Sequence, residues 1–167
     1  MTHQIYISVG SNVDRNKHTI AGLNGMALEF GELTLSNVYE SEAVGFSGSH
    51  FYNLVVGAKT SKTIKEVCET LKSIESRNGR VRQEKKFAPR TLDLDLLLYD
   101  QIVTKDGVDL PRAEIEYNAF VLLPLSEIAP EYAHPIVNKT IGELWQAYDK
   151  TKQKLWKIDF NWSNPQP

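Results

Sequence analysis

The run Leu-Asp-Leu-Asp-Leu-Leu-Leu at residues 92–98 constrains the fold more than any other part of this sequence. Successive side chains of a β-strand point to opposite faces, so Asp93 and Asp95 share one face and lie about 6.6 Å apart along the strand. The leucines that alternate with them point the other way, into a core. Acidic residues are unfavourable in strand interiors. The run therefore predicts a strand with one apolar face and two carboxylates on the other.

The residues just before this strand are rich in cations. Two carboxylates on one face repel each other unless a cation lies between them, and Mg²⁺ prefers oxygen ligands of this kind. The neighbouring cations would then suit a polyphosphate. The alternative is a half-buried strand with a wet outer face, beside a basic loop that is merely solvated. With Pro89-Arg90 directly upstream, we favour a metal–nucleotide site. The cations are Arg80, Arg82, Lys85, Lys86 and Arg90.

The composition is that of an ordinary globular domain, with 41% hydrophobic and 24% charged residues. The 167 residues fit one domain, which we expect at residues 1–160, with residues 161–167 as a flexible tail. A net charge of −2 disfavours a protein built to hold nucleic acid by counterion release. The N-terminus lacks the plan of a signal peptide, and no apolar run reaches the length of a membrane span. We expect a cytoplasmic monomer without nucleic-acid or membrane partners.

Hydrophobic periodicity predicts an α+β domain with the split β-α-β order of ferredoxin-like folds. The sheet should be mainly antiparallel, with the helices packed on one face. The turns near Gly10 and the stretches 45–50 and 80–90 could then gather at one edge of the sheet. The predicted strands cover residues 5–9, 33–40, 51–60, 92–99, 101–104 and 154–160, and the predicted helices cover residues 13–29, 63–78, 120–125 and 141–148.

Several common chemistries are excluded by motifs that the sequence lacks. It has no Gly-x-x-x-x-Gly-Lys-Ser/Thr loop, no Gly-x-Gly-x-x-Gly and no Gly-x-Ser-x-Gly elbow. The single cysteine, Cys68, excludes an intramolecular disulfide and a cysteine-based zinc site, and it is an improbable nucleophile. Two carboxylates that bind metal beside a group of arginines are the equipment of phosphoryl or pyrophosphoryl transfer.

The segment Ala-Pro-Arg-Thr-Leu-Asp-Leu-Asp-Leu-Leu at residues 88–97 closely resembles the signature of the 6-hydroxymethyl-7,8-dihydropterin pyrophosphokinase family. The resemblance covers about residues 4–145 and includes Gly-Ser-Asn at 10–12, Phe-Tyr-Asn at 51–53 and the apolar run from Phe120 to Pro130. It implies an enzyme of folate biosynthesis. Such an enzyme transfers pyrophosphate from ATP to the hydroxymethyl group of a reduced pterin and releases AMP.

The resemblance also implies roles for particular side chains. Asp93 and Asp95 would hold two Mg²⁺ ions that bridge the ATP phosphates, and with Arg82 and Arg90 they would form the catalytic set. ATP would contact Lys72, Glu75, Arg82, Arg90, Leu96 and Arg112. The pterin would contact Ser41, Val44, Phe51, Asn53 and Phe120. Without the resemblance, Glu75 would be a solvated helix position, Asn53 a strand-edge residue and Phe120 part of the core.

Four positions depart from the family pattern. Phe87 stands where a tryptophan is common, and Lys72 stands where a glutamine is usual. Arg112 follows Pro111 where a histidine is usual, and Asn118 stands where an arginine is usual. Arg112 can replace positive charge at the triphosphate, but Asn118 cannot. These departures leave a second interpretation open, a diverged paralogue that binds pterin or nucleotide with little transfer.

A third interpretation is a nucleic-acid-binding module, because split β-α-β folds and basic loops also occur in such modules. The net charge of −2 and the two carboxylates of Asp93 and Asp95, called the acid pair below, disfavour it.

Overall fold

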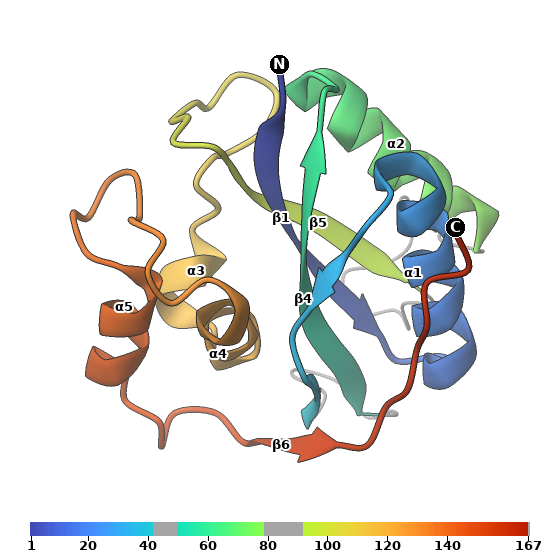
Figure 1. The fold of residues 1–167 in the computed structure, drawn as a ribbon. Coiled ribbons are helices and arrows are strands. Elements are labelled where there is room, and N and C mark those ends of the chain that lie inside the picture. Colours follow the sequence, from blue (N-terminus) through green and yellow to red (C-terminus); the bar gives the residue numbers. More distant parts are fainter. Residues whose placement is uncertain (42–49, 79–91, 167) are drawn as a thin grey trace.

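The computed structural model describes residues 1–41, 50–78 and 92–166. Its centre is an antiparallel sheet (Figure 1). Within the described residues, the strands run in the order β5-β1-β4-β3-β6, and β2 also pairs with β4. This confirms the predicted ferredoxin-like sheet, in which β1, β3, β4 and β5 are the four expected strands. The strands are β1 (His3–Ser11), β2 (Thr34–Leu35), β3 (Val38–Ser41), β4 (Phe51–Thr60), β5 (Asp93–Tyr99) and β6 (Leu155–Ile158).

Helices α1 (Arg15–Phe30) and α2 (Ile64–Arg77) cover one face of the sheet. A capping box starts α2, because Thr63 and Glu66 each accept a hydrogen bond from the other's backbone N–H. The apolar stripe of α2 then packs on the sheet. The first core cluster includes Ile5, Ile7, Leu54, Val56, Leu94 and Leu96 from the sheet and Leu23, Met26, Val67, Leu71 and Ile74 from the helices.

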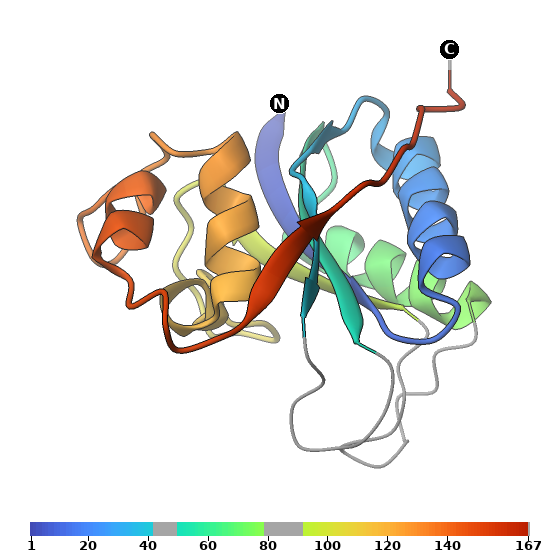
Figure 2. The ribbon, with the colours of Figure 1, turned by 90° about the horizontal axis from the view of Figure 1, so that it is seen from below.

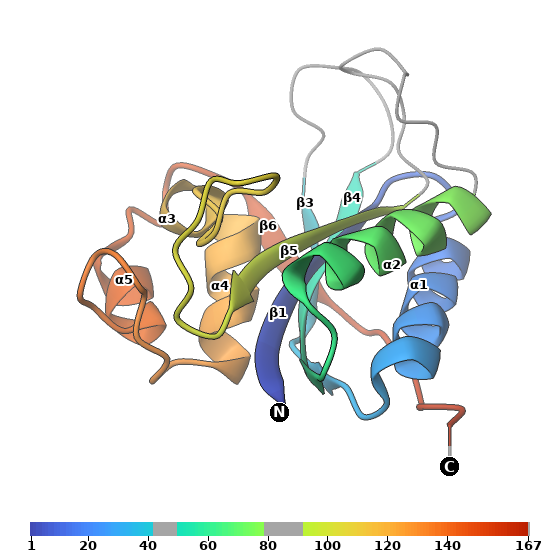
Figure 3. The same ribbon diagram turned by 90° about the horizontal axis from the view of Figure 1, so that it is seen from above.

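The opposite face is also covered, which corrects the prediction that the helices would pack on one face only. Helices α3 (Glu114–Tyr117), α4 (Ala119–Ile128) and α5 (Ile141–Ala147) lie there, and α4 contacts β4 and β3. Figures 2 and 3 show the two helical layers with the sheet between them. The physical reason lies in β4, where residues 53–58 are all buried. A strand that is buried on both faces needs a cover on each side.

A bulge in β5 separates its polar half from its apolar half. The pairing with β1 shifts between Tyr6 and Ile7, so Tyr6 lies opposite Leu98 while Ile7 lies opposite Leu96. Leu97 is the extra residue, and both Leu97 and Leu98 pack into the second core cluster beneath α4. Before the bulge the strict alternation holds. Leu94 and Leu96 therefore enter the first core, and the acid pair faces the side of α3 and α4.

Three other predicted elements differ from the structure. The strand expected over residues 33–40 is divided into β2 and β3, because the Ser36 hydroxyl accepts a hydrogen bond of 2.9 Å from the backbone N–H of Val55. The strand expected at residues 101–104 is reduced to an isolated bridge between Thr104 and Leu110. The helix expected at residues 120–125 is longer and includes Pro124. Within the described ranges, no helix has the length and apolar character needed to cross a bilayer.

The C-terminal segment, expected to be a flexible tail, lies beside α1 (Figure 1). Trp162 Nε1 donates a hydrogen bond of 2.9 Å to Asn24 Oδ1, and the ring packs against the first core cluster. Asn164 Nδ2 donates to the carbonyl oxygen of Gly31 at 3.2 Å. The sequence pattern did not predict these contacts, which join the segment to the domain.

Candidate active site

The acid pair lies at the start of β5. Asp93 lies opposite Gly10 of β1, Asp95 lies opposite Ser8, and both carboxylates are partly exposed. A Cβ atom at Gly10 would lie 3.4 Å from Asn53 Oδ1 and 3.9 Å from Asp93 Cβ. Asp93 and Asn53 therefore lie on either side of the small volume that a Cβ atom would fill. A turn is expected near Gly10 from the sequence, but β1 continues through this residue to Ser11.

The buried carboxylate of Glu75 contacts the backbone of β5, which is an edge strand of the sheet. Its Oε2 atom accepts a hydrogen bond of 2.7 Å from the backbone N–H of Leu94, and the residue is 1% exposed. A solvated helix position, the interpretation without the family resemblance, is therefore wrong. In this arrangement Glu75 satisfies a backbone donor at the sheet edge, where such donors are otherwise unpaired.

A pocket of about 200 Å³ lies at this edge between α2 and the segment before α3. It brings together Lys72, Asp95, Leu96 and Arg112, all of which were predicted from the resemblance to contact ATP or metal. Its remaining lining residues are Cys68, Leu71, Leu94, Gly107 and Val108. The pocket thus combines aliphatic walls with two cations and one carboxylate. Flat heterocycles and phosphates suit such a lining.

The thiol in this pocket is not an activated nucleophile. Burial raises the pKa of the Cys68 thiol, although Lys72 and Arg112 act in the opposite direction. A raised pKa keeps the thiol protonated and unreactive near neutral pH. This agrees with the expectation that Cys68 has no nucleophilic role.

Arg112 is the charged centre of the pocket. Its Nη2 atom lies 3.5 Å from Asp95 Oδ1, and its Nε atom donates to Glu114 Oε1 at 2.9 Å. Burial lowers the pKa of Arg112, but Asp95, Glu114 and Asp93 outweigh burial and raise it. The guanidinium is therefore firmly charged and lies beside the carboxylates that would bind metal.

Asn118, which also departs from the family pattern, belongs to the same network. Its Nδ2 atom donates to Glu114 Oε2 at 2.8 Å, and its Oδ1 atom accepts from Gln153 Nε2 at 2.9 Å. Glu114 thus links Asn118 to Arg112. Position 118 is joined to the acid pair through two side chains, and its own side chain carries no charge.

The described residues predicted to contact the pterin come from β3, β4 and α4, and those on the sheet share the face of the acid pair on the far side of β1. Asn53 Nδ2 donates to Ser41 Oγ at 2.9 Å, and both residues are buried. Phe51 is half-buried at the start of β4, and Phe120 packs at the edge of the second core cluster. The other three predicted residues, Val44, Arg82 and Arg90, lie outside the described residues.

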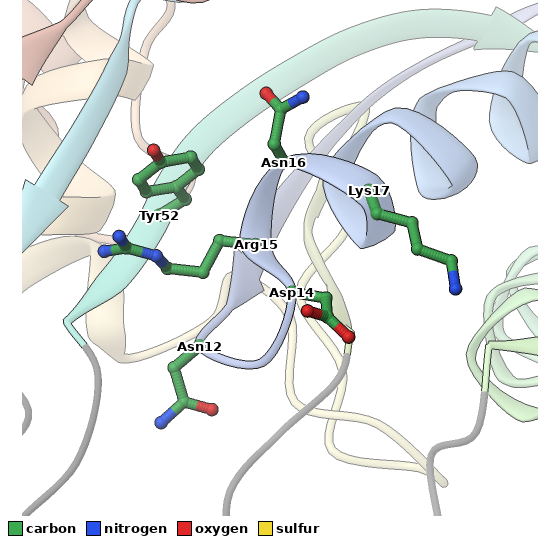
Figure 4. A pocket seen from close by; sticks show the side chains of 6 residues that line it. All are labelled: Asn12, Asp14, Arg15, Asn16, Lys17 and Tyr52. Atoms are coloured by element: carbon green, nitrogen blue, oxygen red, sulfur yellow. The ribbon is translucent and has the colours of Figure 1, made fainter.

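A second pocket, of about 510 Å³, lies at the start of α1 and was not predicted (Figure 4). Arg15 extends towards Tyr52 in this view, with its guanidinium carbon 4.3 Å from the ring centroid. Arg15 also forms an ion pair with Glu40 and donates to the carbonyl oxygen of His50 at 3.0 Å. The lining comprises Asn12, Asp14, Arg15, Asn16, Lys17 and Tyr52.

The donor set of the acid pair fits Mg²⁺. Among the described residues, no group of three or more histidine, cysteine or acidic side chains could hold a metal by itself. Mg²⁺ usually takes one or two protein carboxylates and completes its shell with waters and substrate phosphates. Two partly exposed carboxylates on one face, beside a pocket that could hold a polyphosphate, meet that requirement.

Comparisons with known proteins identify the family of this chain. The family model described as 7,8-dihydro-6-hydroxymethylpterin-pyrophosphokinase matches residues 6–130. The chain belongs to this family. A relative from Aquifex aeolicus, named 2-amino-4-hydroxy-6-hydroxymethyldihydropteridine pyrophosphokinase, is 36% identical over 143 residues, which cover 83% of this chain and 88% of the relative. A relative of the same name from Synechocystis sp. is 39% identical over 124 residues, which cover 74% of this chain and 62% of the relative.

Solved structures of the family share the fold. A Plasmodium falciparum HPPK-DHPS triple mutant with pteroate superposes with a TM-score of 0.69 at 15% identity, over 87% of this chain and 43% of that one. An HPPK-DHPS in complex with substrates gives a TM-score of 0.70 at 15% identity, over 89% of this chain and 43% of that one. The chain therefore spans less than half of these longer proteins.

Proposed function

We propose that this chain transfers pyrophosphate from ATP to the hydroxymethyl group of 6-hydroxymethyl-7,8-dihydropterin and releases AMP, a step of folate biosynthesis. As a member of the family, it is an ATP-dependent pyrophosphokinase. The observation that carries the proposal is the position of the two aspartates on one face of β5: Asp95 lines the pocket that contains Lys72 and Arg112, and Asp93 lies near Asn53 across Gly10. A donor and an acceptor of pyrophosphate could meet there.

ATP would occupy the pocket at the edge of β5. The aliphatic walls around Leu96 and Val108 suit the adenine ring, and Lys72 and Arg112 supply positive charge for the phosphates. Arg82 and Arg90 are proposed as further phosphate contacts on the family resemblance alone. Arginine is well suited to this role because its planar donors match phosphate oxygens.

Asp93 and Asp95 would hold two Mg²⁺ ions. When bound, the ions would neutralise the phosphate charge and align the alcohol with the phosphorus that it attacks. Asp95 and Arg112, 3.5 Å apart in this structure, supply opposite charges at the place where the phosphates would lie. Glu75 would act indirectly, by holding the backbone of Leu94 between the two aspartates.

The pterin would lie between Asn53 and the aromatic rings of Phe51 and Phe120. A flat heterocycle needs an apolar face and a few fixed polar groups. Asn53 is fixed because Ser41 Oγ accepts one of its amide protons, and its Oδ1 atom, which lies near Gly10, would be the acceptor for the pterin. Val44 is proposed as an additional contact on the resemblance alone. We also propose a cytoplasmic monomer that takes small-molecule substrates and no nucleic acid.

The proposal is tested by mixing the protein with MgATP, with and without 6-hydroxymethyl-7,8-dihydropterin, and separating the nucleotides. AMP formed in equal amount to a pyrophosphorylated pterin is expected. ADP in place of AMP would indicate transfer of a single phosphoryl group and would contradict the proposal. No product from folded protein that binds both substrates would favour the diverged paralogue instead.

A further inference from the structure

Strand β6 pairs with β3, which carries Ser41 of the proposed pterin site. It lies at the edge of the sheet beyond β3 (Figure 2). Leu155 of β6 lies opposite Ser41. The family model matches residues 6–130, so β6 lies outside the matched region.

Trp156 fastens β6 on the other face of β3. Its Nε1 atom donates a hydrogen bond of 2.8 Å to Glu40 Oε2, and its ring meets the His50 ring edge-on at 5.4 Å. Glu40 is the neighbour of Ser41 at the end of β3, and His50 is the first described residue before β4. Trp156 therefore contacts both β3 and the residue that precedes β4.

The contacts of Trp156 continue into the pocket of Figure 4. Glu40 forms an ion pair with Arg15, which donates to the carbonyl oxygen of His50 and stacks on Tyr52. Burial raises the pKa of the Glu40 carboxyl, but the hydrogen bonds from Arg15 and Trp156 outweigh burial and lower it. The carboxylate is thus held by a cation on one oxygen and an indole on the other.

We propose that β6, fastened by Trp156, is a positioning element for the pterin site. The backbone of β6 holds Ser41, the Ser41 hydroxyl holds the Asn53 amide, and Asn53 faces the proposed substrate. Trp156 touches no reacting group and acts through these residues. The inference rests on the proposed function, since it takes Asn53 as a contact of the pterin.

The test compares two variants with the same chemical change. Trp156→Phe keeps an aromatic ring beside His50 but removes the N–H that Glu40 accepts. Trp162→Phe removes an equivalent indole N–H, the one bonded to Asn24 beside α1, from the same C-terminal segment. We expect Trp156→Phe to raise the KM for pterin about three- to tenfold, with kcat and the KM for ATP within about twofold. Trp162→Phe should leave all three constants near those of the unchanged protein.

A second readout separates this inference from the proposed function. Amide hydrogen exchange of the free protein at Ser41 and Asn53 should be faster in Trp156→Phe and unchanged in Trp162→Phe. Absence of AMP from the unchanged protein, with faster exchange in Trp156→Phe, would overturn the proposed function while the placement of Ser41 by β6 stands. Unchanged exchange and unchanged KM in Trp156→Phe, or equal increases in the KM for both substrates, would overturn the positioning role.

Discussion

Glu75 Oε2 accepts a hydrogen bond of 2.7 Å from the backbone N–H of Leu94, the residue between the two aspartates of the acid pair. Leu94 itself is buried in the first core cluster. One buried carboxylate on α2 therefore holds the strand at the point where Asp93 and Asp95 point the other way. The position of the acid pair therefore depends on the contact between Glu75 of α2 and the backbone of β5.

Replacing Glu75 tests whether this contact positions the acid pair. Glu75→Leu leaves the Leu94 N–H without this acceptor and should lower the free energy of unfolding by about 1–3 kcal/mol. A shift of the acid pair should also lower kcat by about 10- to 100-fold. Glu75→Gln keeps a carbonyl oxygen as acceptor and should lose much less. Urea unfolding and AMP release measure both effects, and equal kcat in the two variants would contradict this role.

Arg112 should matter chiefly for ATP. Losing one charged phosphate contact costs about 1.5–3 kcal/mol, so Arg112→Gln should raise the KM for ATP by about one to two decades. The KM for pterin should change little, because Asn53 lies on the far side of the acid pair. Lys59→Gln, at the end of β4 opposite to Asn53, is the control and should leave both values unchanged. Steady-state kinetics would refute the assignment if pterin affinity fell as much as ATP affinity.

Adding positive charge at position 118 should improve ATP binding. Glu114 already links Asn118 to Arg112, so an arginine there could contact both Glu114 and the triphosphate. We expect Asn118→Arg to lower the KM for ATP about tenfold. Asn118→Gln, longer but neutral, controls for side-chain size. An identical change in both variants would show that charge at this position is irrelevant.

The ion pair of Glu40 predicts a dependence of stability on pH. Its pKa in the folded protein is lowered below the ordinary value of 4.5. A lowered carboxyl pKa stabilises the fold fully above the unfolded value, and this stabilisation is lost as the pH falls through the folded value.

At pH 7, Glu40→Gln should therefore lower the free energy of unfolding by about 1–2 kcal/mol, given that the side chain is partly exposed. Below pH 4.5 the difference from the unchanged protein should shrink, because a protonated glutamate resembles glutamine. Glu32→Gln, at an exposed position, should show neither effect. A difference that grew on acidification would have the wrong sign.

Local patterns predicted a large part of this fold. The apolar run around Val55 fixed β4 at residues 51–60. Strict alternation placed Asp93 and Asp95 on one face. The cover on the second face was missed, although the unbroken apolar run Leu54-Val55-Val56 in β4 is typical of a strand buried on both faces. The split between β2 and β3 was missed for a different reason, since it depends on a hydrogen bond between Ser36 and a residue in another strand.

The site residues recognised from the family were easier to name than to place. The burial of Glu75 depends on an acceptor–donor contact across 19 positions, and the ion pair of Arg112 depends on the path from β5 to α3. Neither leaves a local pattern. The contact of Trp156 could not be predicted from the sequence, because its partner Glu40 lies 116 positions earlier in the chain.

The most direct test of the acid pair is pterin-dependent AMP release by Asp95→Asn. Asparagine keeps the shape of the side chain and removes the charge that would hold Mg²⁺, so kcat should fall at least about 10³-fold in folded protein. Asp159→Asn, an exposed position just after β6 at the opposite edge of the sheet, should retain full activity. Asp95→Asn with the rate of the unchanged protein would contradict the assignment of the acid pair as the metal site.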